Sequence, residues 1–75
     1  MKRVVRFTDV NEIEEFVNCA RKVKLDVIAS KQNFSYQVDA ASLLGMMLLL
    51  GEKITIEFVD TTDEFNGVLS KYAVK

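Results

Sequence analysis

The feature that most constrains this chain is an apolar run near its middle, from Val38 to Leu50, that reads as the start and body of a helix. A helix on a protein surface hides an apolar stripe roughly 100° wide. The apolar side chains of this run cover almost the whole circumference, so we expect some of them to face solvent. They are Leu43, Leu44, Met46, Met47, Leu48, Leu49 and Leu50. An exposed apolar patch of this kind indicates a docking surface.

Two polar residues at the start of the run suggest a switch beside that surface. Asp39 is a good helix cap, which places Ser42 in the first turn of the predicted helix. A phosphate on Ser42 would meet the positive end of the helix dipole. Ser42 is therefore a candidate phosphorylation and regulatory residue, although serine is also an ordinary residue of a first helical turn.

Length and charge limit the classes of protein to consider. The chain of 75 residues is long enough for one domain, residues 1–75, and a chain this short buries only about 60% of its unfolded surface. Ten Lys and Arg residues against eleven Asp and Glu residues give a formal charge of −1, without the basic excess that nucleic-acid binding needs. We expect no nucleic-acid partner.

Cysteine and histidine usage excludes several kinds of site. Cys19 is the only cysteine and there is no histidine, so an internal disulfide, imidazole catalysis and histidine metal ligation are impossible. We expect no metal, no cofactor and no enzymatic activity, and we place Cys19 on a helix flank as an inert thiol. No apolar run is long enough to cross a membrane and the N-terminus lacks a secretory signal, so the predicted location is cytoplasmic.

The hydrophobic periodicity predicts seven elements. Strands are expected over residues 2–7, 25–30, 34–38 and 53–59, with residues 31–33 as a hairpin connection between the second and third. Asp9 and Glu12 have capping-box spacing at the start of a helix over residues 10–22. The second helix ends at Gly51, and a third begins within residues 60–64 and runs to the end.

This order, β-α-β-β-α-β-α, predicts an α+β fold. Each element is apolar on one side, so the four strands are expected to form one antiparallel sheet with the helices on a single face. Ferredoxin-like folds begin with the same order, which leaves the assignment open at this level.

The segment Val38-Asp39-Ala40-Ala41-Ser42-Leu43-Leu44-Gly45-Met46-Met47 resembles the regulatory-serine segment of HPr. HPr is the histidine-containing phosphocarrier of the bacterial phosphoenolpyruvate-dependent sugar phosphotransferase system. The element order matches over most of the chain, whereas the sequence-specific match covers residues 38–47. The resemblance implies an HPr-like open-faced β-sandwich with a regulatory Ser42. It also implies partner contacts through Leu43, Leu44 and Met47. Helical spacing puts Met46, Leu49 and Leu50 opposite to them, so we expect these three residues to supply more of the core.

The chain departs from the family where HPr carries its phosphate. HPr proteins have a segment typically Gly-Leu-His-Ala-Arg-Pro, and the chain has Phe7-Thr8-Asp9-Val10-Asn11-Glu12 instead. Asp9 stands at the histidine position and Asn11 at the arginine position. A phosphohistidine relay needs both missing groups, so carrier activity is not expected. Asp9 could mimic a phosphohistidine or form an acyl phosphate, but a plain helix cap is the favoured interpretation.

Two functions remain as hypotheses. The resemblance implies a regulatory or binding member of the phosphotransferase system that acts through the Ser42 helix rather than as a carrier. Its partners would be an ATP-dependent serine kinase, other phosphotransferase components or a carbon-responsive regulator. The alternative is a generic protein-interaction or self-associating module that has the HPr fold without a phosphotransferase-system role.

Overall fold

The computed structural model describes residues 1–31 and 36–74. Along the chain these residues form β1 (Lys2–Val5), α1 (Val10–Ala20), β2 (Ile28–Lys31), β3 (Gln37–Asp39), α2 (Leu43–Met47), β4 (Ile54–Glu57) and α3 (Asp63–Lys71). The predicted elements are all present, and most are shorter than predicted. Lys31, predicted in the hairpin connection, is the last residue of β2. Residues 32–35, which hold the rest of the predicted connection and the start of the third predicted strand, lie outside the described residues.

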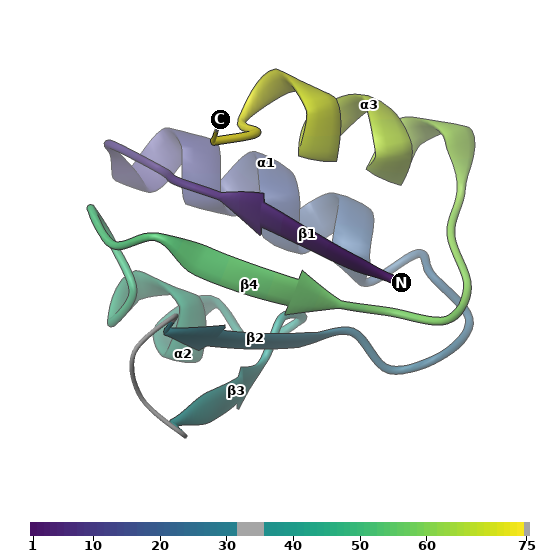
Figure 1. Cartoon of the computed structure of the whole chain (residues 1–75), viewed down its shortest axis with the longest axis horizontal. Helices are drawn as coiled ribbons and strands as arrows, with labels where there is room; N and C mark the ends of the chain where they lie inside the picture. The colour runs from purple at the N-terminus through teal and green to yellow at the C-terminus, as the bar shows by residue number, and fades with distance from the viewer. Residues whose placement is uncertain (32–35, 75) are drawn as a thin grey trace.

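The four strands form one sheet in the order β1-β4-β2-β3, and every neighbouring pair is antiparallel. The helices lie together on one face of it (Figure 1). Alternation along the strands explains this arrangement, because Val5, Ile54 and Ile56 are fully buried whereas Lys2 and Glu57 pair on the open face. The predicted α+β fold with an open-faced antiparallel sheet is confirmed.

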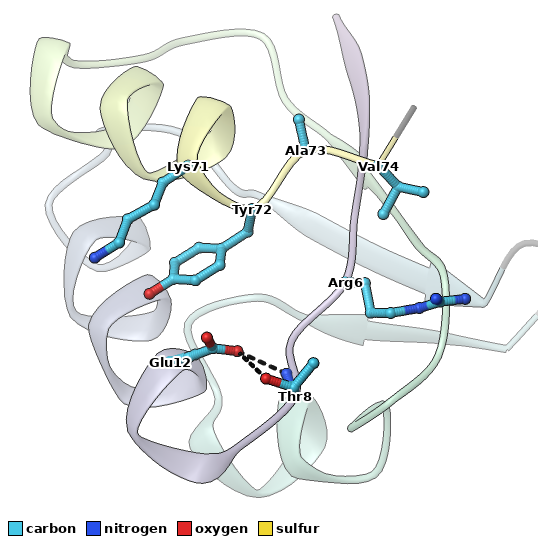
Figure 2. A pocket seen from close by; sticks show the side chains of 7 residues that line it. All are labelled: Arg6, Thr8, Glu12, Lys71, Tyr72, Ala73 and Val74. Atoms are coloured by element: carbon cyan, nitrogen blue, oxygen red, sulfur yellow. Dashed lines mark hydrogen bonds between the residues drawn. The ribbon is translucent and has the colours of Figure 1, made fainter.

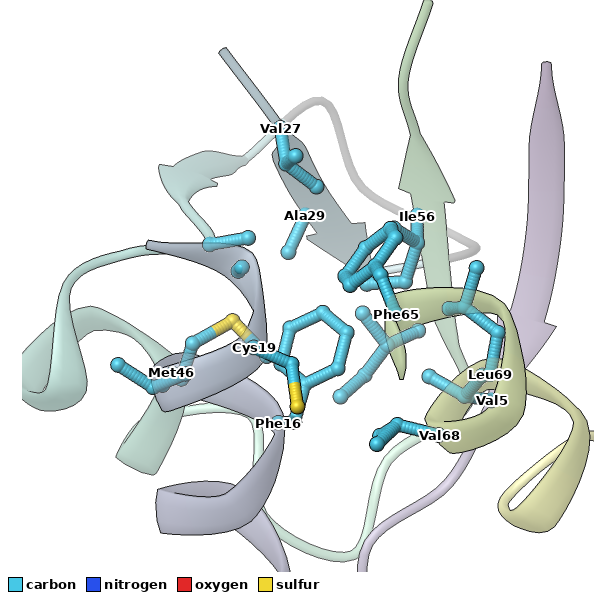
Figure 3. Packing of buried hydrophobic residues seen from close by; sticks show 14 of the residues in the cluster. Val5, Phe16, Cys19, Val27, Ala29, Met46, Ile56, Phe65, Val68 and Leu69 are labelled. Atoms are coloured by element: carbon cyan, nitrogen blue, oxygen red, sulfur yellow. The ribbon is translucent and has the colours of Figure 1, made fainter. Parts of the chain in front are cut away.

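Aromatic side chains from four segments meet in the core. Phe16 of α1 lies 5.1 Å from Phe7 and 5.6 Å from Phe65 of α3, measured between ring centroids. Phe58 packs edge-on against Phe65 at 5.4 Å. Aliphatic residues of the sheet and of α2, such as Ile56 and Met46, complete this core (Figure 3). The core therefore joins all three helices to the sheet.

Side-chain caps fix where the helices begin. The hydroxyl of Thr62 accepts a hydrogen bond from the Phe65 backbone N–H at 3.0 Å, which sets the first turn of α3. Asp9 caps α1 in the same way.

None of the helices in the described residues is long and apolar enough to span a membrane.

The end of the chain returns to β1. Ala73 forms an isolated antiparallel bridge with Val5, Arg6 N–H donates to the Tyr72 carbonyl at 3.1 Å, and Val74 N–H donates to the Val4 carbonyl at 3.0 Å. Residues 72–74 thus run along the outer edge of β1, while β3 forms the opposite edge of the sheet. This places the end of α3 beside the loop that leads into α1.

Candidate functional site

The start of α2 differs from the prediction by three residues. Ser42, not Asp39, is the N-cap, and its hydroxyl accepts a hydrogen bond from the Gly45 N–H at 3.3 Å. Asp39 belongs to β3, where it pairs with Ile28, and its carboxylate accepts from the Ala41 N–H at 2.9 Å. The prediction of Asp39 as the helix cap is therefore wrong, because strand pairing holds Asp39 in the sheet. Ser42 precedes the first turn rather than lying within it.

The side chains of α2 and of the two residues after it range from fully buried to largely exposed. Met46 and Leu49 are fully buried, as predicted. Leu44 is 80% exposed and Leu48, just after the helix, is 65% exposed. These two leucines are four residues apart, so they are neighbours on the side of the helix that faces away from the sheet. Met47 lies beside them at 39% exposure.

Three residues of this region need a different role from the one the sequence suggested. Leu43 is half-buried and packs against the core, so it lies at the margin of the exposed face rather than on it. Leu50, expected in the core, is 40% exposed because it belongs to the turn after α2, where helical periodicity no longer applies. Leu48 was not among the predicted contact residues, although its spacing from Leu44 was a usable signal. We use the term α2 surface for Leu44, Met47 and Leu48.

Arg21 connects α1 to the start of α2. Its side-chain Nε donates a hydrogen bond to the Ala41 carbonyl at 3.2 Å, next to Ser42. A depression of about 190 Å³ lies between the two helices, lined by Glu14, Val17, Asn18, Arg21 and Leu43. A cation is thus fixed beside the α2 N-cap. Sequence reasoning missed Arg21, because 20 residues separate it from its partner.

Asp9, which replaces the phosphohistidine, is a helix cap. Its Oδ1 accepts a hydrogen bond from the Glu12 N–H at 3.0 Å, as the capping-box spacing predicts. The reciprocal bond goes to the preceding residue instead, because Glu12 Oε1 accepts from the Thr8 N–H at 2.6 Å and from the Thr8 hydroxyl at 3.0 Å. Asp9 itself is exposed. Its carboxylate is therefore used by the helix and has no cationic neighbour in a salt bridge within the described residues.

A shallow depression of about 370 Å³ lies close to this cap (Figure 2). It is lined by Arg6, Thr8, Glu12, Lys71, Tyr72, Ala73 and Val74. The Tyr72 hydroxyl donates to Glu15 at 2.6 Å and Lys71 pairs with the same carboxylate at 3.3 Å. These contacts lower the pKa of Glu15 and raise the pKa values of Lys71 and Tyr72. Lys71 is thus ion-paired with Glu15, and none of the residues that line this depression is arranged as a nucleophile with a base.

Cys19, which the sequence placed on the flank of α1, is buried. It is only 4% exposed, because α3 packs against that side of α1. Burial and the hydrogen bond that its Sγ donates to Glu64 at 3.2 Å raise the pKa of the thiol from 9.0 to about 11. The thiol is therefore protonated at neutral pH, which agrees with the predicted inert role.

No group of three or more histidine, cysteine or acidic residues that could hold a metal ion occurs in the part of the chain that the structure describes. Comparisons of the chain with protein-family models, with curated proteins and with solved structures found no match. The candidate site therefore rests on the geometry of α2 and its neighbours.

Proposed function

We propose that this protein is an HPr-like binding protein of the bacterial sugar phosphotransferase system that regulates partners and does not carry phosphate from phosphoenolpyruvate. The observation that carries the proposal is the α2 surface, where Leu44 is 80% exposed and Leu48 is 65% exposed, while Met46 and Leu49 of the same segment are fully buried. Isolated exposed leucines are common, but neighbouring ones on one helix face favour a protein contact.

The chemistry around Asp9 supports a role without phosphate transfer. An acyl phosphate on Asp9 would leave only an uncharged carbonyl oxygen to accept the Glu12 N–H, so the cap of α1 would be weakened during each cycle. The arginine that stabilises the transferred phosphoryl group in HPr proteins is Asn11 here. We therefore propose a non-enzymatic, cytoplasmic protein whose effects come from binding.

Ser42 gives this proposal its regulated step. Its hydroxyl lies at the α2 N-cap, next to Leu43 and Leu44 and beside the Ala41 carbonyl that holds Arg21. A phosphate there would place about two negative charges at the border of the α2 surface, close to one fixed cation. An ATP-dependent serine kinase would thereby change which partner the α2 surface accepts. The proposed partners are that kinase, other phosphotransferase components and a carbon-responsive regulator.

The first experiment tests the switch. The protein is incubated with an HPr serine kinase and radiolabelled ATP, and incorporation of label is compared with that of Ser42→Ala. We expect label on the wild type only. Ser70→Ala, which removes an exposed serine on α3, is the matched control and should be labelled like the wild type. Absence of label on the wild type, or equal label on Ser42→Ala, contradicts the regulatory role of Ser42.

The second experiment tests the surface. Binding of the kinase to the immobilised protein is measured for the wild type and for Leu48→Glu, which should lose at least tenfold in affinity because a charge would be buried at the contact. Val59→Glu is the matched control, since Val59 is 72% exposed away from α2. Equal loss in both variants, or loss in neither, contradicts a docking role of the α2 surface.

A further inference from the structure

The segment that contains α2 has no charged residue from Ala40 to Gly51, whereas charged residues make up 28% of the whole chain. Depletion of charge is typical of the centre of a protein interface. The surface is therefore suited to an apolar partner, and a second copy of the same surface is one such partner. Two copies also repel each other little, because the net charge of the chain is only −1.

We propose that the α2 surface is covered by the α2 surface of a second copy, with the two helices antiparallel about a two-fold axis. The inference rests on the proposed binding role of this surface and names its occupant. Leu44 of one copy would contact Leu48 of the other, and the same contact would be repeated by symmetry. Both leucines project from the same side of the helix, which is the requirement for such a reciprocal contact.

Charges at the two ends of α2 favour the antiparallel arrangement. Arg21 is held at the start of α2 through the Ala41 carbonyl. Glu52 lies in the turn after α2, where its N–H donates to the Leu49 carbonyl at 3.1 Å, and its half-exposed carboxylate forms a long ion pair with Lys31 of the same chain at 3.9 Å. Antiparallel pairing brings the start of one helix against the end of the other, so Arg21 of each copy would face Glu52 of its partner. The helix dipoles are also opposed in this arrangement, which is favourable.

The size of the surface sets the expected strength. A standard interface buries about 800 Å² on each partner, which is about a sixth of the 4703 Å² of this protein. The three side chains of the α2 surface and the residues around them supply less area than a standard interface. The proposed dimer therefore belongs with the small, weak interfaces, and we expect a dissociation constant of about 10 µM or more.

Sedimentation equilibrium from about 1 µM to about 1 mM tests the dimer across that range. The wild type should pass from monomer to dimer, whereas Leu44→Glu should stay monomeric at every concentration. Leu44 is 80% exposed, so this variant should keep the wild-type fold, which circular dichroism checks. Val59→Glu should dimerise like the wild type. A monomeric wild type, or a dimer that persists in Leu44→Glu, overturns the proposal.

Charge reversal tests the antiparallel arrangement. Arg21→Glu and Glu52→Arg should each weaken the dimer by at least fivefold, and the double variant should regain most of the wild-type affinity. A purely structural role of the Arg21 contact with Ala41 would not be restored by a change at residue 52, so failure of the double variant overturns the arrangement. The kinase experiments above are to be run below about 10 µM protein, which is under the expected dimer range. A monomeric wild type therefore overturns this inference alone, whereas loss of kinase recognition overturns the proposed function alone.

Discussion

The thiol of Cys19 donates a hydrogen bond to the carboxylate of Glu64, and this contact joins α1 to α3. Lys22 pairs with the same carboxylate at 3.4 Å on the exposed side. The hydrogen bond from the Cys19 thiol and the positive charge of Lys22 both stabilise the charged form of the carboxylate, so they lower the pKa of Glu64. The buried side of this small cluster is thus neutral and the exposed side is ion-paired.

The reactivity of Cys19 provides the first prediction. Because its pKa is raised from 9.0 to about 11, the thiolate fraction near neutral pH should fall about a hundredfold. Iodoacetamide should therefore modify the native protein far more slowly than the protein in denaturant, as followed by mass spectrometry. Similar rates in the two states would contradict the buried, hydrogen-bonded thiol.

Acid stability provides the second prediction. Hydrogen bonds from Tyr72 and Lys71 lower the pKa of Glu15 from its ordinary 4.5, so the unfolded state binds the proton first as the pH falls. Stability from this carboxylate is present above pH 4.5 and is lost as the pH falls through the folded-state pKa. Urea unfolding midpoints should thus depend less on pH in this acid range for Glu15→Gln. The exposed neighbour Glu14→Gln is the control.

Two adjacent leucines provide the third prediction. Leu49 is fully buried and Leu48 is 65% exposed. Leu49→Ala should lower the free energy of unfolding by about 2–5 kcal/mol, because it leaves a cavity in the core. Leu48→Ala should change it by less than about 0.5 kcal/mol. Chemical denaturation of both variants at low protein concentration measures the difference, and equal losses would contradict the orientation of α2.

Two glycines provide the fourth prediction. A Cβ atom added at Gly45 would lie 3.1 Å from the Val38 Cβ, whereas one added at Gly67 meets nothing within 4 Å. Gly67→Ala should stabilise the protein by up to about 1 kcal/mol through helix propensity. Gly45→Ala should destabilise it by about 1–2 kcal/mol, since crowding outweighs the same gain. The Val38→Ala/Gly45→Ala variant should lose less than the sum of the single variants, and additive losses would show that the crowding is absent.

Asp9 provides the fifth prediction. Removal of its cap in Asp9→Ala should lower the free energy of unfolding by about 1 kcal/mol.

Incubation of the wild type with enzyme I and radiolabelled phosphoenolpyruvate should leave the protein unlabelled, with an HPr protein as the positive control. Hydroxylamine-sensitive label on Asp9 would refute a non-carrier role.

The sequence predicted the element order and most of the core because the apolar residues repeat with clear periods. The choice of the α2 cap was not predictable in this way. Asp39 and Ser42 are both good caps, and the decision depends on the pairing of Asp39 with Ile28 across the sheet. That pairing is tertiary, so local preferences do not reveal it. The shift of the cap also changed which leucines face solvent.

Cys19 shows the same limit on α1. Helical spacing identified the stripe that faces the sheet, with Phe16 and Val17 fully or almost fully buried. A second side of α1 is covered by α3, and no pattern in the sequence of α1 predicts that contact. The excess of apolar residues around α2 was enough to predict an exposed apolar surface there. Which side chains form that surface could be determined only from the position at which the helix begins in the structure.

The strand-like contact of residues 72–74 with β1 has a consequence for association between sheets. Edge strands invite pairing with other chains, and this contact occupies one edge of the sheet. In the part of the chain described, β3 is left as the edge that could accept another strand. Two sheets that met there would each use their β3 edge, and the contact of residues 72–74 with Val4 to Arg6 would hinder further growth at the opposite edge.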